Sequence, residues 1–400
     1  MNEQQKTLVI ESIIESLELP DSAYEKAKSR YDDIGDWFGR DESQCKDNKP
    51  HIFSQGSFRL GTAIHPIDEN EPYDLDLVCE LQKGITKSVH TQQFLKTKVG
   101  KEIEAYRAKR GIKAPKEEKH RCWRLNYADE LSFHMDIVPC IPAEEPRRKS
   151  MFESMKVFGE SEFVAKTVSE LAVSITDDRH PRYFQISDEW FISNPGGYTK
   201  WFEFRMKQAE KYLNERVVAL KEADIDKLPT FMWKTPLQRC VQILKRHRDQ
   251  MFKDEPDLKP ISMIITTLAA KAYSGETNIN DAMQKILSQM GQFVNKSFPK
   301  VPNPVNPKGE DFAEKWAKNP QLEKSFRFWL QQAQNAFQKI GDAIDEKIVT
   351  GHVLKEFSIS LNESDLRKRF GLIEQSTNDG LKYSGPIIVN AKLPGRHYVS

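Results

Sequence analysis

The stretch that decides the fold is YDLDLVCEL, residues 73–81. Side chains alternate between the two faces of an extended strand, so Asp74 and Asp76 point to one face while Leu75 and Leu77 face the core. Two carboxylates this close repel each other and lose solvation when partly buried, which raises their pKa values unless a cation lies between them. Mg²⁺ prefers hard oxygen ligands and shares them with substrate phosphates. The stretch therefore predicts a two-faced strand with a metal site on its polar face.

A third carboxylate follows in SFHMDIVPCI, residues 132–141. Phe133, Met135 and Ile137 alternate with Asp136 along this run, so they point to one face and Asp136 points to the other, polar face. The run can pair beside the first strand. Two-metal phosphoryl-transfer sites need a third carboxylate from a neighbouring strand. We therefore expect Asp74, Asp76 and Asp136 to share a metal site.

A glycine-serine pair precedes the first strand, in GSFRLGTAIHP, residues 56–66. Gly56 lets the backbone approach a phosphate closely, and Ser57 adds a hydroxyl and an N–H donor for the β- and γ-phosphates. Arg59 or Arg121 can add charge, although spacing alone places neither. Each motif is common by itself, and a lone D-x-D is more often a solvated strand edge. Their order along the chain is hard to explain if all of these residues are merely polar side chains exposed to solvent.

Composition limits the classes of partner and compartment. The 400 residues include 60 Lys plus Arg and 59 Asp plus Glu, so the net charge of +1 gives no global attraction to nucleic acid or membrane. The five cysteines are scattered without a CxxC pair, which argues against a disulfide framework or a zinc ribbon. No apolar run approaches the roughly 20 residues of a membrane span, and the amino terminus is too acidic for a secretory signal. We expect a cytoplasmic protein without a membrane partner.

The pattern along the chain predicts an α+β fold with a small mixed sheet. We expect three parts: an amino-terminal helical spine with the catalytic core at 1–190, a helical lobe at 191–370 and a tail at 371–400. The tail lacks a clear period. We expect two loops, a charged one at AEEPRRKS, residues 143–150, and a proline-rich surface loop at PKVPNPVNPKG, residues 299–309.

The helical half holds an amphipathic helix in TPLQRCVQILKRHRDQMF, residues 235–252. Lys245, Arg246 and Arg248 cluster near its polar side, and the pattern alone favours a solvated basic face.

A second helix start lies in ISNPGGYTKWFEFRM, residues 192–206. Asn194 caps the helix and Pro195 occupies its first turn. Tyr198 has two interpretations: it is one of several core-facing aromatics, or it lies near the cleft and stacks on a nucleobase.

The motifs GSFRLGTAIHP, YDLDLVCEL and FHMDIVPCIP resemble the catalytic core of the DNA polymerase beta-type nucleotidyltransferases. Within them, the chain is most similar to the bacterial cyclic GMP-AMP synthase/DncV-like nucleotidyltransferases of anti-phage (CBASS) signalling. The resemblance implies a bilobal fold with an oligoadenylate-synthase-like helical second lobe and an active site in the cleft. The resemblance implies that Asp74, Asp76 and Asp136 bind metal and that Ser57 binds phosphate.

The resemblance also implies that Lys245 and Ser262, the latter in KPISMIITTLAAKAY, hold the triphosphate. It implies two Mg²⁺ or Mn²⁺ ions per site and NTP substrates, ATP among them, condensed into a cyclic di- or trinucleotide with release of pyrophosphate. It further implies a regulatory partner, either a peptide-binding regulator or a ubiquitin-transfer-like enzyme. The clustered Cys and His of vertebrate relatives are missing, so strong direct DNA binding is not expected.

Two alternatives remain open from the residues. The same three carboxylates serve enzymes with linear products, either oligoadenylate synthase-like or RNA-tailing. An inactive nucleotide-binding scaffold is the second alternative, and the intact acidic motifs argue against it. Spacing does not fix the bases, the ring size or the linkage.

Overall fold

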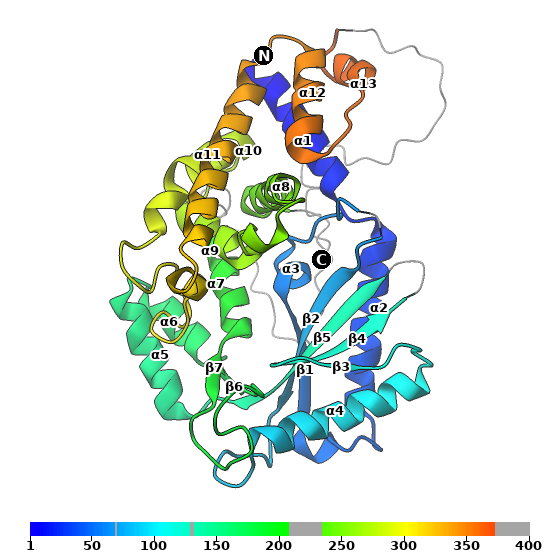
Figure 1. The fold of residues 1–400 in the computed structure, drawn as a ribbon, viewed down its shortest axis with the longest axis vertical. Coiled ribbons are helices and arrows are strands. Elements are labelled where there is room, and N and C mark those ends of the chain that lie inside the picture. Colours follow the sequence, from blue (N-terminus) through cyan, green and yellow to red (C-terminus); the bar gives the residue numbers. More distant parts are fainter. Residues whose placement is uncertain (69, 129–131, 208–233, 373–400) are drawn as a thin grey trace, which may run out of the picture.

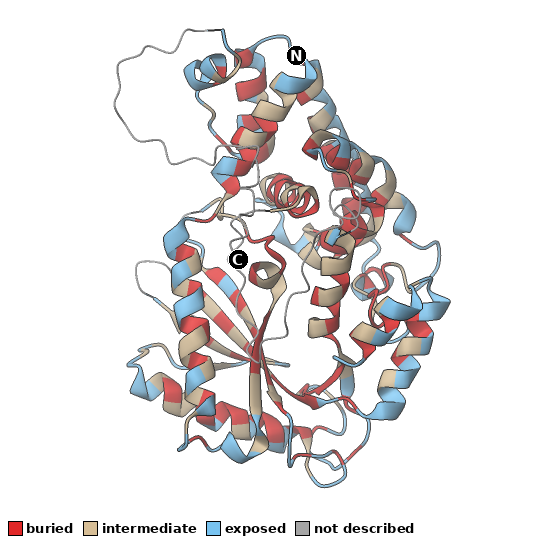
Figure 2. Ribbon diagram, turned by 180° about the vertical axis from the view of Figure 1, so that it is seen from behind, coloured by how far each residue is buried: buried red, intermediate tan, exposed pale blue. Residues whose placement is uncertain are grey.

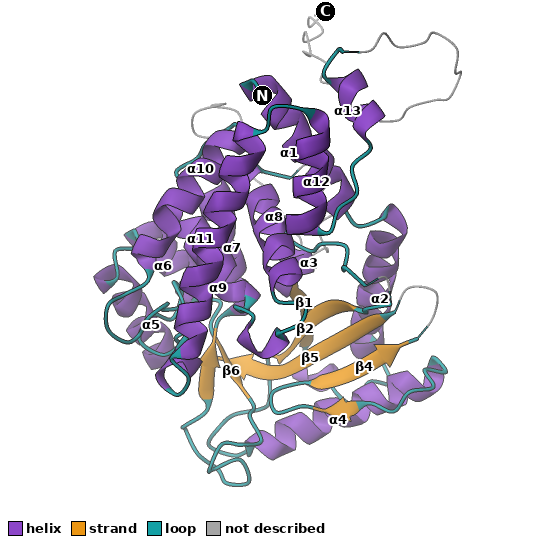
Figure 3. Ribbon diagram, turned by 45° about the horizontal axis from the view of Figure 1, so that its top comes forward, coloured by secondary structure: helices purple, strands orange, loops and turns teal. Residues whose placement is uncertain are grey.

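The computed structural model describes residues 1–68, 70–128, 132–207 and 234–372. Figure 1 shows a strand-rich lobe and a helical lobe, as Figure 3 does from a second direction. The predicted α+β, bilobal fold is confirmed. The expected tail lies outside the described residues beyond residue 372.

The strand-rich lobe is built on one mixed sheet. Its main path runs β1-β2-β5-β4-β3, and β6 pairs with both β5 and β7. The pairing of β2 with β5 is parallel and the other pairings are antiparallel. The strands are β1 Pro50–Gln55, β2 Tyr73–Leu81, β3 Glu117–Glu118, β4 Trp123–Tyr127, β5 Phe133–Pro142, β6 Val173–Ile175 and β7 Phe191–Ser193.

Alternation makes β2 two-faced, as the sequence predicts. Leu75 and Leu77 are fully buried, whereas the Asp74 side chain is 64% exposed. The buried face packs in a core shared with α2 and α4, which cover this side of the sheet (Figure 1). The polar face is thereby left on the side of the sheet away from α2 and α4.

The helices complete both lobes. They are α1 Glu3–Leu17, α2 Asp21–Gly39, α3 Gly56–Leu60, α4 Gln92–Lys109, α5 Glu145–Val157, α6 Glu162–Ser169, α7 Pro195–Lys207, α8 Pro236–Met251, α9 Ser262–Ala272, α10 Ile279–Gln289, α11 Gln321–Asp342, α12 Glu346–Phe357 and α13 Glu363–Arg369. None of the helices in the described ranges combines the length and the apolar character needed to cross a membrane.

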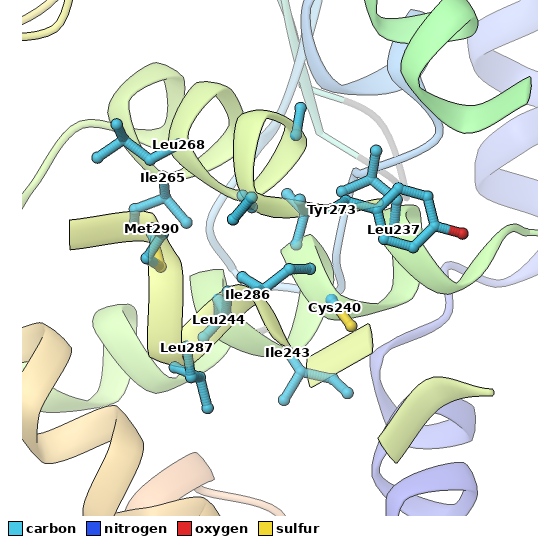
Figure 4. Packing of buried hydrophobic residues seen from close by; sticks show 14 of the residues in the cluster. Leu237, Cys240, Ile243, Leu244, Ile265, Leu268, Tyr273, Ile286, Leu287 and Met290 are labelled. Carbon is cyan, nitrogen blue, oxygen red and sulfur yellow. The ribbon is translucent and has the colours of Figure 1, made fainter. Parts of the chain in front are cut away.

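Helix α8 is the centre of the helical lobe. It contacts α1, α9, α10, α11 and α12, and Figure 2 shows it coloured mainly as buried. Figure 4 shows Leu244 of α8, Ile265 of α9 and Ile286 of α10 in one apolar cluster. Because neighbours surround α8, its basic residues Lys245 and Arg248 are also buried, at 7% and 5% exposed. The expected solvated basic face is therefore wrong.

Two expected loops differ from the structure. Residues 143–150 are not a loop throughout, since α5 begins at Glu145 with proline in its first turn, where a missing N–H costs nothing. Residues 299–309 form no α-helix, as expected, but residues 301–307 are buried and only the end of the segment, 308–309, is exposed. Val301 and Val305 are fully buried in the helical core, so this segment is part of the packing.

The packing divides the chain differently from the expected boundary at residue 190. Helix α1 packs in the core of the helical lobe, and Val9 and Ile13 are fully buried there. Strand β7, Phe191–Ser193, belongs to the sheet through its pairing with β6. The chain thus starts in the helical lobe with α1, then forms the strands of the sheet, and then continues into the remaining helices of the helical lobe.

Candidate active site

The pair of aspartates on β2 lies beside Asp136 on β5. The expected pairing of the two strands is confirmed, and their parallel register sets Asp76 directly against Asp136. Strand β1 flanks β2 on its other side, where Gln55 pairs with Asp76. The three carboxylates therefore come from adjacent strands of one sheet.

Asp136 is bound by a residue that the sequence analysis does not identify. Arg124 on β4 lies opposite Asp136 in the antiparallel register. Its Nε donates to Oδ1 of Asp136 at 2.6 Å and its Nη2 donates to Oδ2 at 2.8 Å. The signal for Arg124 is its place between buried Trp123 and Leu125, which puts it on the polar face of its strand. Only the hairpin register shows which carboxylate it meets.

Crowding changes the acidity of Asp76. Burial raises the pKa of its carboxyl to about 7, and repulsion from Asp74 and Asp136 adds to the increase. Arg124 and Lys245 act in the opposite direction. We call the surface formed by Asp74, Asp76 and Asp136 the acidic face. The negative charges on this face repel one another, and a further cation would reduce that repulsion.

The glycine-serine turn meets Asp76 directly. Gly56 has φ +69°, a left-handed conformation that favours glycine. A Cβ at this position would lie 2.2 Å from Oδ2 of Asp76, so no other residue fits without a shift. Ser57 follows in the first turn of α3. Gly56 thus allows close approach to a carboxylate, besides the phosphate approach expected from the sequence.

The helical lobe supplies Lys245 and Ser262 to the same region. Nζ of Lys245 donates to the carbonyl oxygen of Thr62 at 2.8 Å. Burial, with a smaller effect of nearby Arg248, lowers the pKa of this lysine to about 8. Nη1 of Arg248 donates to Oγ of Ser262 at 2.8 Å, and the same guanidinium binds Asp249. Arg248 therefore fixes the serine hydroxyl at the start of α9.

One cavity of about 830 Å³ brings these groups together between the two lobes. Its size falls within the usual range of small-molecule sites. Its walls include six residues predicted from the sequence, namely Gly56, Ser57, Asp74, Asp76, Lys245 and Ser262. Arg248, Asp249, Lys253 and Lys259 also line it. Asp136 lies beside Asp76 on the adjacent strand and is not among the lining residues.

Tyr198 does not lie on this cavity. Its side chain is buried in the helical core and its hydroxyl shares a hydrogen bond of 2.8 Å with that of Thr267. Stacking on a base requires an open ring face. We therefore assign Tyr198 to packing, which corrects its interpretation as a base-stacking residue.

The two other arginines considered from the sequence also bind elsewhere. Arg59 contacts Glu203 at 3.2 Å, and Arg121 contacts Asp177 at 2.7 Å. Neither lines the cavity.

The donor set suits a hard divalent cation. Asp74 and Asp76 offer carboxylate oxygens at the cavity wall, and Asp136 is aligned with Asp76. Both oxygens of Asp136 are bound to Arg124, and among the described residues no three acidic, histidine or cysteine side chains are gathered at ligand spacing. Asp74 and Asp76 thus have the ligand chemistry that a hard cation prefers, and Arg124 would share the Asp136 carboxylate with any metal ion bound there.

Comparison with known proteins agrees with this geometry. Residues 50–139, which include the turn and all three aspartates, match the family model of the cyclic GMP-AMP synthase DncV-like nucleotidyltransferase domain. A c-di-GMP synthase from Roseivirga ehrenbergii is 28% identical over 341 residues, covering 84% of this chain and 80% of the relative. The cyclic dinucleotide synthase CdnG of Bradyrhizobium diazoefficiens is 22% identical over 405 residues, covering 96% and 88%.

Solved structures share the fold. CdnG from Bradyrhizobium diazoefficiens in complex with GTP superposes with a TM-score of 0.60 at 16% identity, covering 93% of this chain and 99% of that one. CdnC of E. coli MS115-1, solved with a truncated HORMA protein, superposes with a TM-score of 0.57 at 13% identity, covering 89% and 98%. Residues 50–139 are thus similar to the DncV-like nucleotidyltransferase domain, and the chain shares its fold and most of its length with cyclic dinucleotide synthases.

Proposed function

We propose that the protein condenses nucleoside triphosphates into a cyclic dinucleotide and releases pyrophosphate at each step. The observation that carries the proposal is the shared cavity, which joins the glycine-serine turn, the β2 aspartates and the buried Lys245. The relatives named as c-di-GMP and cyclic dinucleotide synthases support a product of two nucleotides. GTP, bound in the CdnG structure, and ATP, expected from the resemblance, are the proposed substrates.

The chain's own residues position the triphosphate. Lys245 places a buried ammonium at the cavity wall, Arg248 holds the Ser262 hydroxyl, and Ser57 offers a hydroxyl and an N–H donor. A ribose hydroxyl oxygen then bonds to the α-phosphorus while the bond to the β-phosphate oxygen breaks. Pyrophosphate leaves, and the hydroxyl proton passes to solvent. The same step on the linear product closes the ring and releases a second pyrophosphate.

We propose Mg²⁺ or Mn²⁺ as the cofactor, with two ions per site that Asp74, Asp76 and Asp136 would hold. When bound, such ions neutralise the triphosphate and lower the pKa of the attacking hydroxyl. Catalysis then depends on positioning and charge neutralisation.

The test is product analysis with all four NTPs and Mg²⁺ or Mn²⁺, followed by phosphatase treatment and mass spectrometry. We expect a phosphatase-resistant cyclic dinucleotide that disappears in Asp74→Ala/Asp76→Ala. A product that phosphatase degrades would instead indicate a linear-product enzyme. Nucleotide binding without turnover, with Mg²⁺ and Mn²⁺ each supplied, would indicate an inactive scaffold.

We also propose a role in anti-phage (CBASS) signalling in the cytoplasm, under the control of a regulatory protein encoded with the enzyme. The solved complex of CdnC with a HORMA protein supports control by a partner. Phage plating on cells that carry the wild type or Asp74→Ala/Asp76→Ala, with and without the neighbouring genes, tests this role. Equal plating in all four strains would contradict it.

A further inference from the structure

Arg124 and Asp136 form a bidentate salt bridge. Both carboxylate oxygens of Asp136 accept N–H donors from one guanidinium, at 2.6 and 2.8 Å. The side chains are 24% and 20% exposed, so water screens the pair only in part. Charge-assisted bonds of this fork geometry are stronger and more directional than single contacts. Arg124 therefore holds Asp136 firmly as the structure stands.

The same guanidinium reaches the rest of the acidic face. Nη2 of Arg124 lies 4.0 Å from Oδ1 of Asp74, and Nη1 lies 3.2 Å from Nδ1 of His134. That ring nitrogen is in turn 3.5 Å from Oδ1 of Asp74. Arg124 thus lies within 4.0 Å of carboxylates from two strands, Asp136 on β5 and Asp74 on β2.

We infer that Arg124 is an internal counter-ion, which holds Asp136 in the metal-free protein and competes with a divalent cation for this carboxylate. The inference rests on the proposed metal-dependent function. Arg124 occupies one lone pair on each oxygen of Asp136, so a metal ion that binds this carboxylate must share it with the guanidinium or displace the guanidinium. Metal affinity is therefore reduced by the strength of the Arg124 pair, and metal-free stability is increased by it.

Binding of Mn²⁺ alone, without nucleotide, tests the competition. We expect Arg124→Met to bind Mn²⁺ on the order of tenfold more tightly than the wild type, measured from the paramagnetic resonance of free Mn²⁺. In chelator, Arg124→Met should melt at a lower temperature than the wild type, and Mn²⁺ should raise its melting temperature by more. The matched control is Arg121→Met, which removes a guanidinium from Asp177 and not from the acidic face.

A double-mutant cycle separates competition for Asp136 from simple charge repulsion. If Arg124 acts through Asp136, Arg124→Met should leave Mn²⁺ affinity unchanged in the Asp136→Asn background. Arg124→Lys, which keeps the charge but loses the fork, should bind Mn²⁺ more tightly than the wild type. The same gain in both backgrounds, or no gain in either, would overturn the inference.

The outcomes also distinguish this inference from the proposed function. Equal Mn²⁺ binding by the wild type and Arg124→Met would refute competition and leave a metal-dependent synthase intact. Absence of Mn²⁺ binding by either protein would refute competition too. Nucleotide turnover that persists in chelator would then refute the metal part of the proposed function.

Discussion

At the scale of single residues, Gly56 is set by two independent requirements. Its φ of +69° disfavours a side chain, and a Cβ would meet Oδ2 of Asp76 at 2.2 Å. We expect Gly56→Ala to lower kcat/KM by about a hundredfold, because displacing a reacting group by about 1 Å has effects of this size. Steady-state kinetics of pyrophosphate release provides the measurement.

Gly111 offers a control for that substitution. Its φ is +66° and nothing lies within 4 Å of an added Cβ, so Gly111→Ala introduces backbone strain without a clash. We expect it to lower stability and leave turnover unchanged. Equal losses of turnover in the two variants would show that strain, and not contact with Asp76, controls the site.

Asp76 makes stability depend on pH. Its folded pKa of about 7 exceeds the ordinary value of 3.8, mainly through burial, so the folded state holds a proton that the unfolded chain releases between these values. Stability contributed by the protonated form is therefore lost as the pH rises from about 4 to about 7. We expect metal-free Asp76→Asn to gain up to about 4 kcal/mol over the wild type at pH 8, and little at pH 4.

Urea denaturation in chelator at several pH values measures this difference. Asp254→Asn, at an exposed position, is the control. A gain for Asp76→Asn that is larger at pH 4 than at pH 8 would have the wrong sign and would refute the assignment.

At the scale of elements, α8 fixes the 60–65 segment, which connects the glycine-serine turn to the aspartate strand. Buried side chains of α8 donate to four carbonyl oxygens of this segment. The pairs are Gln238 to Leu60, Gln242 to Ala63, Lys245 to Thr62 and Arg246 to His65. The helical lobe therefore sets the position of the turn relative to the carboxylates.

We expect Gln242→Leu to lower kcat/KM about tenfold, because the Ala63 carbonyl loses its 2.7 Å hydrogen bond and the 60–65 segment loosens. The control is Gln250→Leu on the same helix, whose side chain donates to Lys355 at an exposed site. Kinetics of both variants, with circular dichroism to verify folding, makes the comparison. Unchanged kinetics in Gln242→Leu would show that the segment holds its position without α8.

Sequence patterns predicted which helices and strands carry the site residues, but they did not predict which other elements pack around them. Period-two alternation gave both acidic strands, and the cap at Asn194 is confirmed by its 2.9 Å hydrogen bond from the Gly197 N–H. The surroundings of α8 were not predictable in this way, because an amphipathic pattern shows which face is polar and not whether another element covers it.

At the scale of the molecule, α1 ties the start of the chain to the helical lobe. Ile13 is fully buried in that core, and Arg369 near the end of the described chain binds Glu15 of α1. We expect Ile13→Ala to cost about 2–4 kcal/mol of stability through the cavity it leaves. Ile348→Ala, at a residue 48% exposed on α12, is the control.

Thermal unfolding of both variants measures the effect. Similar melting temperatures for Ile13→Ala and Ile348→Ala would show that α1 is not part of the helical core.

The sequence by itself determined that two strands carry carboxylates on one face, since alternation is a local property of extended backbone. It also determined which turn precedes them. Only the tertiary structure decided that Arg124 binds Asp136, that Gly56 touches Asp76 and that Tyr198 is buried. Each of these depends on strand register or on the packing of distant segments, and a one-residue change of register would bring a different side chain to the same place.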